Sequence, residues 1–124
     1  MEQLLYLVIG GAAGTLARYA VVGAAYQKLG AAFPYGTLIV NLAGCFLIGF
    51  FEVIAQKKMA MAPHIRLLLM AGFCGAFTTF SAFILDSHNL IKEGETLRAF
   101  LNVMGSVALG FILFRTGMFL AEII

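Results

Sequence analysis

Long apolar runs, separated by short polar stretches, recur from one end of the chain to the other. About 20 predominantly apolar residues are enough to cross a bilayer as a helix. Runs of that length lie at residues 3–26, 33–55, 66–90 and 97–123. The pattern therefore predicts an all-α membrane protein, built as a single transmembrane domain over residues 1–124 with four spanning helices.

The third run contains the least helix-like stretch of the chain. Its centre, residues 72–83, reads GFCGAFTTFSAF and lies within a stretch without charge from Leu67 to Leu85. Glycines, paired threonines and a serine weaken or bend a helix. A break at membrane depth exposes backbone groups, which is tolerated only inside protein or beside a polar cavity. We therefore predict a broken third helix that handles an ion.

Three phenylalanines recur every third residue in this stretch, at Phe77, Phe80 and Phe83. On a continuous helix they would form a slowly drifting stripe, with Thr79 and Ser81 on other sides. Phenyl rings have positive edges, so rings turned edge-on can coordinate a small anion. Lipid-facing or core packing remains an alternative for all three rings.

Two polar side chains interrupt the first two runs. Arg18 is costly in a membrane unless it snorkels to an interface, or holds backbone or an anion in a vestibule. Asn41 either cross-links helices by hydrogen bonds or lines a polar track. Both alternatives stay open for each residue. Gly10 and Gly14 form a small-xxx-small pattern, which lets helices approach closely.

Composition excludes several classes of function. The chain of 124 residues is 62% apolar and 11% charged, with a mean hydropathy of +0.99. A net charge of +2 does not indicate a nucleic-acid partner. Cys45 and Cys74 lie in apolar runs and are expected to be buried thiols without a disulfide or a metal. No catalytic triad, zinc-ligand spacing or phosphate-binding loop is present in the sequence, so we do not expect an enzyme.

Four spans place both termini on one side of the membrane. Which side this is depends on how the basic residues are distributed between the two sides. The terminal side carries Lys57, Lys58 and Arg66, and the opposite side an equal number, at Lys28, Lys92 and Arg98. The balance favours insertion in both directions and an antiparallel homodimer. Noise in the count from short loops is the alternative explanation.

Two other functions fit a small four-helix membrane protein. A drug/proton antiporter needs a buried glutamate in its first span, but Glu2 precedes that span here. A membrane assembly subunit without transport activity would use Gly10, Gly14 and Gly44 only for packing. A conducted anion instead requires weak uncharged donors, while carbonyls freed at a helix break suit a cation.

Three motifs together identify a family resemblance. Gly10-Gly11-x-x-Gly14-x-x-x-Arg18-Tyr19, Gly36-Thr37-Leu38-x-Val40-Asn41-x-x-Gly44 and Gly72-Phe73-x-Gly75-x-x-Thr78-Thr79-Phe80-Ser81-x-Phe83 stand in order on successive spans. In this combination the chain resembles the CrcB/Fluc family of fluoride channels. The resemblance covers essentially the whole chain.

The resemblance implies a dual-topology antiparallel homodimer in the bacterial inner membrane, with two passive fluoride pores and a structural Na⁺ at its centre. It assigns the Na⁺ to the backbone carbonyls of Gly75 and Thr78. The residues that it places along the pore are Phe80, Phe83, Asn41, Ser81 and Thr79. It gives Arg18 a vestibular or structural role.

The chain departs from the usual family pattern at three positions. Ala82 stands where a threonine is frequent, Asp86 replaces a frequent glutamate, and Asn102 occupies a position often held by tyrosine. The resemblance therefore leaves the pore contacts of the fourth span open.

Overall fold

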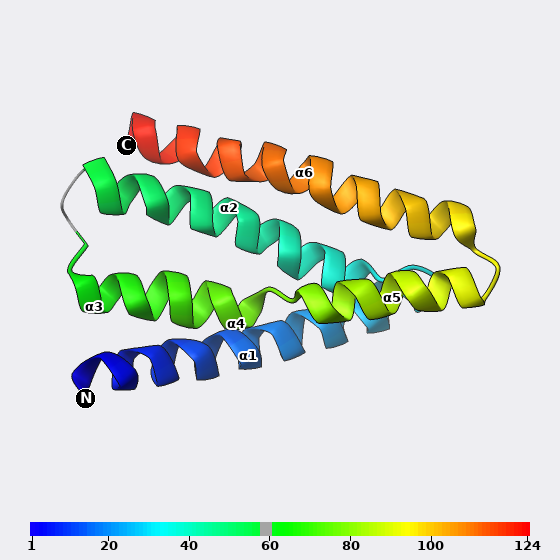
Figure 1. Ribbon diagram of the computed structural model, residues 1–124, viewed down its shortest axis with the longest axis horizontal. Helices are drawn as coiled ribbons and strands as arrows, with labels where there is room; N and C mark the ends of the chain where they lie inside the picture. Colours follow the sequence, from blue (N-terminus) through cyan, green and yellow to red (C-terminus); the bar gives the residue numbers. More distant parts are fainter. Residues whose placement is uncertain (58–60) are drawn as a thin grey trace.

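The computed structural model describes residues 1–57 and 61–124. Within them, four helical spans are long and apolar enough to cross a membrane, as predicted (Figure 1). The first is α1 (Glu2–Leu29), the second α2 (Tyr35–Lys57) and the last α6 (Thr96–Ile123). The third is divided into α3 (Pro63–Arg66), η1 (Leu67–Cys74), α4 (Gly75–Phe77) and α5 (Phe80–Lys92).

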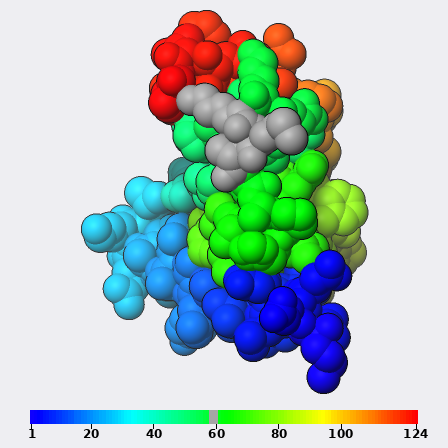
Figure 2. Space-filling view, turned by 90° about the vertical axis from the view of Figure 1, so that its left-hand side faces the viewer, coloured from blue at the N-terminus to red at the C-terminus, as the bar shows by residue number. Residues whose placement is uncertain are grey.

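Both chain termini lie at the same end of the bundle, as four spans require (Figure 1). Figure 2 looks onto that end, with the start of α1 at the bottom, the end of α6 at the top and the third span between them. Lys57 ends α2 and Arg66 ends α3 at this end, whereas Lys28 and Lys92 lie in the last turns of α1 and α5. Lys58 lies outside the described residues.

Close backbone packing joins the helices in two pairs, α1 with η1 and α2 with α6. A Cβ added to Gly10 or Gly14 would lie 2.1 Å or 2.3 Å from a carbonyl oxygen of the third span. Gly49 and Gly117 join α2 to α6 in the same way, where a Cβ would lie 2.2 Å or 2.1 Å from a carbonyl oxygen of the other helix. No larger residue fits without moving backbone. The predicted role of Gly10 and Gly14 in close packing is confirmed.

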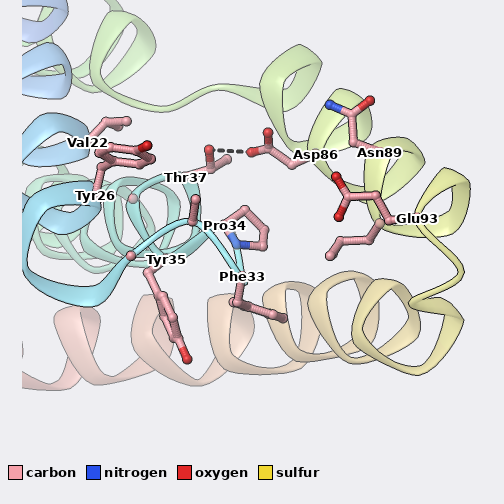
Figure 3. Close-up of a pocket in the computed structure, with 13 residues that line it drawn as sticks. Val22, Tyr26, Phe33, Pro34, Tyr35, Thr37, Asp86, Asn89 and Glu93 are labelled. Atoms are coloured by element: carbon pink, nitrogen blue, oxygen red, sulfur yellow. Dashed lines mark hydrogen bonds between the residues drawn. The ribbon is translucent and has the colours of Figure 1, made fainter.

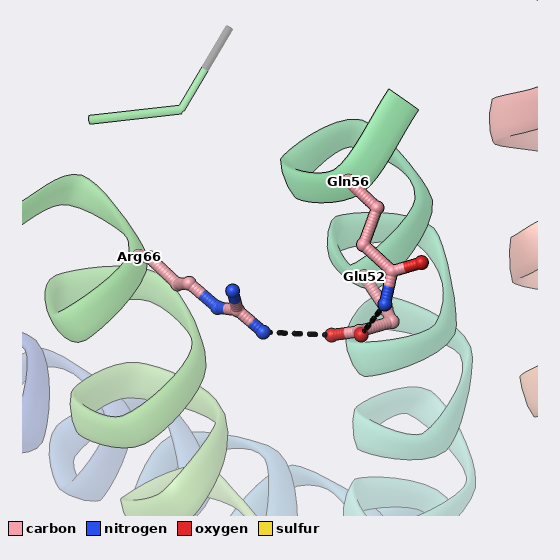
Figure 4. A network of polar contacts seen from close by, with 3 residues as sticks. All are labelled: Glu52, Gln56 and Arg66. Carbon is pink, nitrogen blue, oxygen red and sulfur yellow. Dashed lines mark hydrogen bonds and ion pairs between the residues drawn. The ribbon is translucent and has the colours of Figure 1, made fainter. Parts of the chain in front are cut away.

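A polar contact joins α2 to α3 at the terminal end of the bundle (Figure 4). The carboxylate of Glu52 accepts hydrogen bonds from Gln56, one turn further along α2, and from Arg66, at 3.3 Å. The arginine side chain is half exposed, so this ion pair contributes little to stability. The contact lies where the third span begins, beside the last turns of α2.

The third span is broken at Thr78 and Thr79, near its middle. Thr78 has φ −87° and ψ 158°, and Thr79 has φ −150° and ψ 118°, so both are extended. The predicted break is therefore confirmed, and it is confined to these residues. The phenylalanine stripe that a continuous helix would give is not formed, because the extended residues lie between Phe77 and Phe80 and separate their helices.

Little of the apolar surface is buried within a single chain. The side chains with the least exposure include Val40, Cys74 and Asn102, whereas large hydrophobic residues on every span face outward. A helix that is apolar on most sides suits a lipid or protein environment. Both cysteines carry free thiols; Cys74 is buried, as expected, whereas Cys45 is only partly buried.

Candidate functional site

The side chain of Asn41 holds the broken backbone in place. Its Nδ2 donates to the carbonyl oxygen of Thr79 at 3.0 Å, and its Oδ1 accepts from the Thr79 amide at 2.7 Å. The asparagine comes from α2, so it satisfies from another helix the amide and the carbonyl of Thr79. This geometry shows the helix cross-link that the sequence left as one of two alternatives for Asn41.

The break separates backbone carbonyls before it from their helical donors. In an unbroken helix the amide of Thr79 would donate to the oxygen of Gly75, four residues earlier, but here it donates to Asn41. The amide of Ala82 would likewise donate to the oxygen of Thr78, but it donates instead to Thr79 Oγ1 at 3.2 Å. The carbonyls freed at the break therefore include those of Gly75 and Thr78, the residues that the family resemblance assigns to Na⁺.

A groove of about 320 Å³ lies at the break, on the surface of the chain. It brings together five of the residues singled out from the sequence, with side chains of α2 and η1 completing its wall. Those five are Asn41, Gly75, Thr78, Thr79 and Phe80. The groove therefore combines an amide, carbonyls, hydroxyls and an aromatic ring.

The two phenylalanines after the break have different surroundings. Their ring centroids lie 5.9 Å apart, with the ring planes tilted by 44°. The Phe80 side chain is 75% exposed at the edge of the groove, whereas Phe83 is 8% exposed. Ser81 is exposed, and neither Ser81 nor Phe83 lines the groove. Of the residues predicted to line the pore, a single chain thus brings Asn41, Thr79 and Phe80 together in the groove.

Arg18 lies in a second cavity, on the α1 side of the break. This cavity has a volume of about 610 Å³ and is lined by Thr15, Tyr19 and Tyr26 of α1, among others. Thr79 lines both this cavity and the groove. Within the described residues, no ion pair or hydrogen bond holds the Arg18 guanidinium. The arginine is therefore near the break, although it is not in the groove itself.

A third cavity, of about 270 Å³, opens at the end of the bundle opposite the termini (Figure 3). The hydroxyl of Thr37 donates to Asp86 Oδ2 at 2.6 Å across it. Thr37 and Tyr26 also line the cavity of Arg18, so the two cavities adjoin. The sequence reasoning did not single out Thr37, although a threonine in the second-span motif was a signal.

Comparison with known proteins places the chain in a family. The family described as "CrcB-like protein, Camphor Resistance (CrcB)" matches residues 5–118. The chain belongs to the CrcB-like family. A relative from Maridesulfovibrio salexigens, named "Fluoride-specific ion channel FluC", is 40% identical over 124 residues, covering 100% of this chain and 98% of that protein.

Further CrcB-like relatives have the same name. One from Geobacter sp. is 46% identical over 107 residues, 86% of each chain. Another from Nitrosococcus oceani is 37% identical over 123 residues, 99% of this chain and 98% of that protein. These relatives are named as channels, in agreement with the prediction that the chain is not an enzyme. Its spans and its relatives place it in a bacterial membrane.

The fourth span of this CrcB-like chain turns one polar side chain inward. Asn102 is 2% exposed and donates from Nδ2 to Ser87 Oγ at 3.0 Å. One turn further along α6, Ser106 Oγ is buried and has no hydrogen-bond partner in the part of the chain described here. The fourth span is thus joined to α5 by a buried side-chain amide.

Proposed function

We propose that this protein is a passive, fluoride-selective ion channel, assembled as an antiparallel homodimer with two pores. The observation that carries the proposal is the break at Thr78–Thr79, where Gly75, Asn41 and Phe80 line one groove with the two threonines. The names of the full-length relatives support the choice of fluoride.

The proposed fluoride path uses weak donors rather than a fixed charge. A cationic residue in direct contact would hold fluoride too strongly, whereas successive weak contacts replace water and still release the ion. The ring edges of Phe80 and Phe83, the amide of Asn41 and the hydroxyls of Thr79 and Ser81 are the proposed contacts. The first amides of α5 add positive potential, because they begin a helix directly after the break.

The proposed sodium site uses the carbonyl oxygens of Gly75 and Thr78. Each has lost its helical donor to a side chain, so its lone pairs are free to coordinate a hard cation. The donor set of neutral oxygens suits Na⁺. When bound, the ion supplies a fixed positive charge beside the anion path. Arg18, near the other side of the break, is the proposed vestibular cation.

An antiparallel homodimer is the proposed assembly because one chain leaves the site open. Gly75 and Phe80 are exposed on the chain surface, and a second copy would cover the groove and contribute its own pair of carbonyls. The equal numbers of basic residues on both sides favour insertion in opposite directions.

The test compares fluoride and chloride efflux from liposomes that contain the purified protein, measured with ion-selective electrodes. We expect rapid fluoride efflux and chloride efflux at the level of protein-free liposomes. Equal efflux of the two ions would contradict selectivity. Absence of any ion flux would favour the assembly-subunit alternative, and proton-coupled uptake of an organic cation would favour the antiporter.

A further inference from the structure

The segment that carries both proposed pore rings, α5, is attached to the rest of the chain by few contacts. The extended residues Thr78 and Thr79 separate it from α4. It has 13 residues and packs mainly against α6, with little contact to α2. The orientation of this short helix therefore depends on its packing against α6 and on the side-chain hydrogen bonds across that contact.

One of these hydrogen-bond connections leads from α6 to Phe83. Asn102 Nδ2 donates to Ser87 Oγ at 3.0 Å, and the Ser87 hydroxyl donates to the carbonyl oxygen of Phe83 at 2.8 Å. The exposed fractions are 2% for Asn102, 7% for Ser87 and 8% for Phe83. A buried connection of this kind excludes competing water, so breaking it leaves polar groups without partners.

We infer that Asn102 is a positioning residue, which sets the Phe83 ring through Ser87 and thereby controls fluoride conduction. This inference rests on the proposed function. The proposed role of Asn102 involves no contact with fluoride, because its amide is buried and donates to Ser87. The serine hydroxyl donates its single hydrogen to the carbonyl oxygen of Phe83, and a lone pair of the same oxygen accepts a hydrogen bond from Asn102 Nδ2. The α5 turn that bears Phe83 is thus tied to α6.

The test uses Ser87→Ala, Asn102→Leu and the double variant, each purified as the assembled protein and placed in liposomes. We expect each single variant to lower fluoride efflux per assembled channel by roughly tenfold, and the double variant to be no worse than the single variants. The matched control is Thr116→Val, which removes a hydroxyl bond to the carbonyl oxygen four residues earlier, at an exposed site on α6. It should conduct as wild type.

Other roles of Asn102 give different results. If the amide contacts fluoride directly, Asn102→Leu lowers efflux while Ser87→Ala leaves it unchanged, which overturns the inference. If the bond only stabilises the fold, both variants have lower melting temperatures and wild-type efflux per assembled channel, which also overturns it. If Asn102→Leu does not assemble, the efflux of Ser87→Ala alone tests the inference, because this variant removes both hydrogen bonds with the loss of one oxygen atom. Wild-type efflux in Ser87→Ala would then overturn the inference.

A second measurement observes the ring without relying on transport. With 4-fluorophenylalanine incorporated at position 83, fluorine NMR should show a shifted or broadened resonance in Ser87→Ala and Asn102→Leu, but not in Thr116→Val. An unchanged resonance overturns the inference even if the channel conducts. A shifted resonance in a protein without fluoride flux would support the positioning role and contradict the proposed function alone.

Discussion

Two substitutions of Asn41 separate its role as an anchor from its proposed role in the pore. The wild-type amide makes hydrogen bonds of 3.0 Å and 2.7 Å to the backbone of Thr79. Asn41→Leu removes both bonds and adds no charge. Asn41→Asp retains an acceptor for the Thr79 amide, but it places a carboxylate oxygen opposite the Thr79 carbonyl.

The magnitudes of the two effects differ. A hydrogen bond between membrane helices contributes roughly 0.6 to 1.7 kcal/mol, so losing both destabilises the protein by about 1 to 3 kcal/mol. A carboxylate about 4 Å from a passing anion raises the energy of the ion by roughly 4 kcal/mol at an effective dielectric constant of about 20. That increase corresponds to efflux slowed by about a thousandfold.

We therefore expect Asn41→Asp to assemble and to block fluoride efflux, and Asn41→Leu to lower the melting temperature of the assembled protein. Efflux from liposomes and thermal unfolding in detergent measure the two effects on the same samples. Wild-type efflux in Asn41→Asp would remove Asn41 from the pore. An unchanged melting temperature in Asn41→Leu would refute the anchoring role.

Two further predictions test the rings and the helix packing. Phe80→Ile and Phe83→Ile should each sharply reduce fluoride efflux without loss of assembly, because an aliphatic side chain has no positive ring edge; wild-type efflux in the double variant would refute the role of the rings. Gly10→Ala should prevent assembly, since its Cβ would lie 2.1 Å from Leu68 O, whereas Gly11→Ala, with nothing within 4 Å, should elute from gel filtration as wild type. Equal elution of the two glycine variants would show that α1 and η1 can separate.

The spans and the existence of the break were predictable because both depend on local composition. Hydropathy defines the spans, and the threonines in residues 72–83 indicated the break. Its exact place was less predictable, because the partner that stabilises it, Asn41, lies 38 residues earlier in the chain. The hydrogen bond between Thr37 and Asp86 was unpredictable for the same reason, because the two residues are 49 positions apart in the chain.

The fourth span illustrates a different limit of sequence reasoning. Asn102 was a polar inclusion in an apolar run, and nothing local indicated which helix it would contact. The structure shows that it bonds to Ser87, 15 residues earlier, because the short connection between α5 and α6 makes the two helices antiparallel neighbours. Ser87 gives no signal in the sequence, because a lone serine near a helix end is common.

The carbonyl groups released at Gly75 and Thr78 also bear on how the protein is made. In hydrocarbon, each peptide oxygen without a partner costs several kcal/mol, and Gly75 faces the outside of the chain. A newly inserted copy that stays alone in the bilayer is therefore at a free-energy disadvantage until something covers this surface. In the proposed dimer, the same two-residue interruption would penalise solitary copies and favour their pairing during biogenesis.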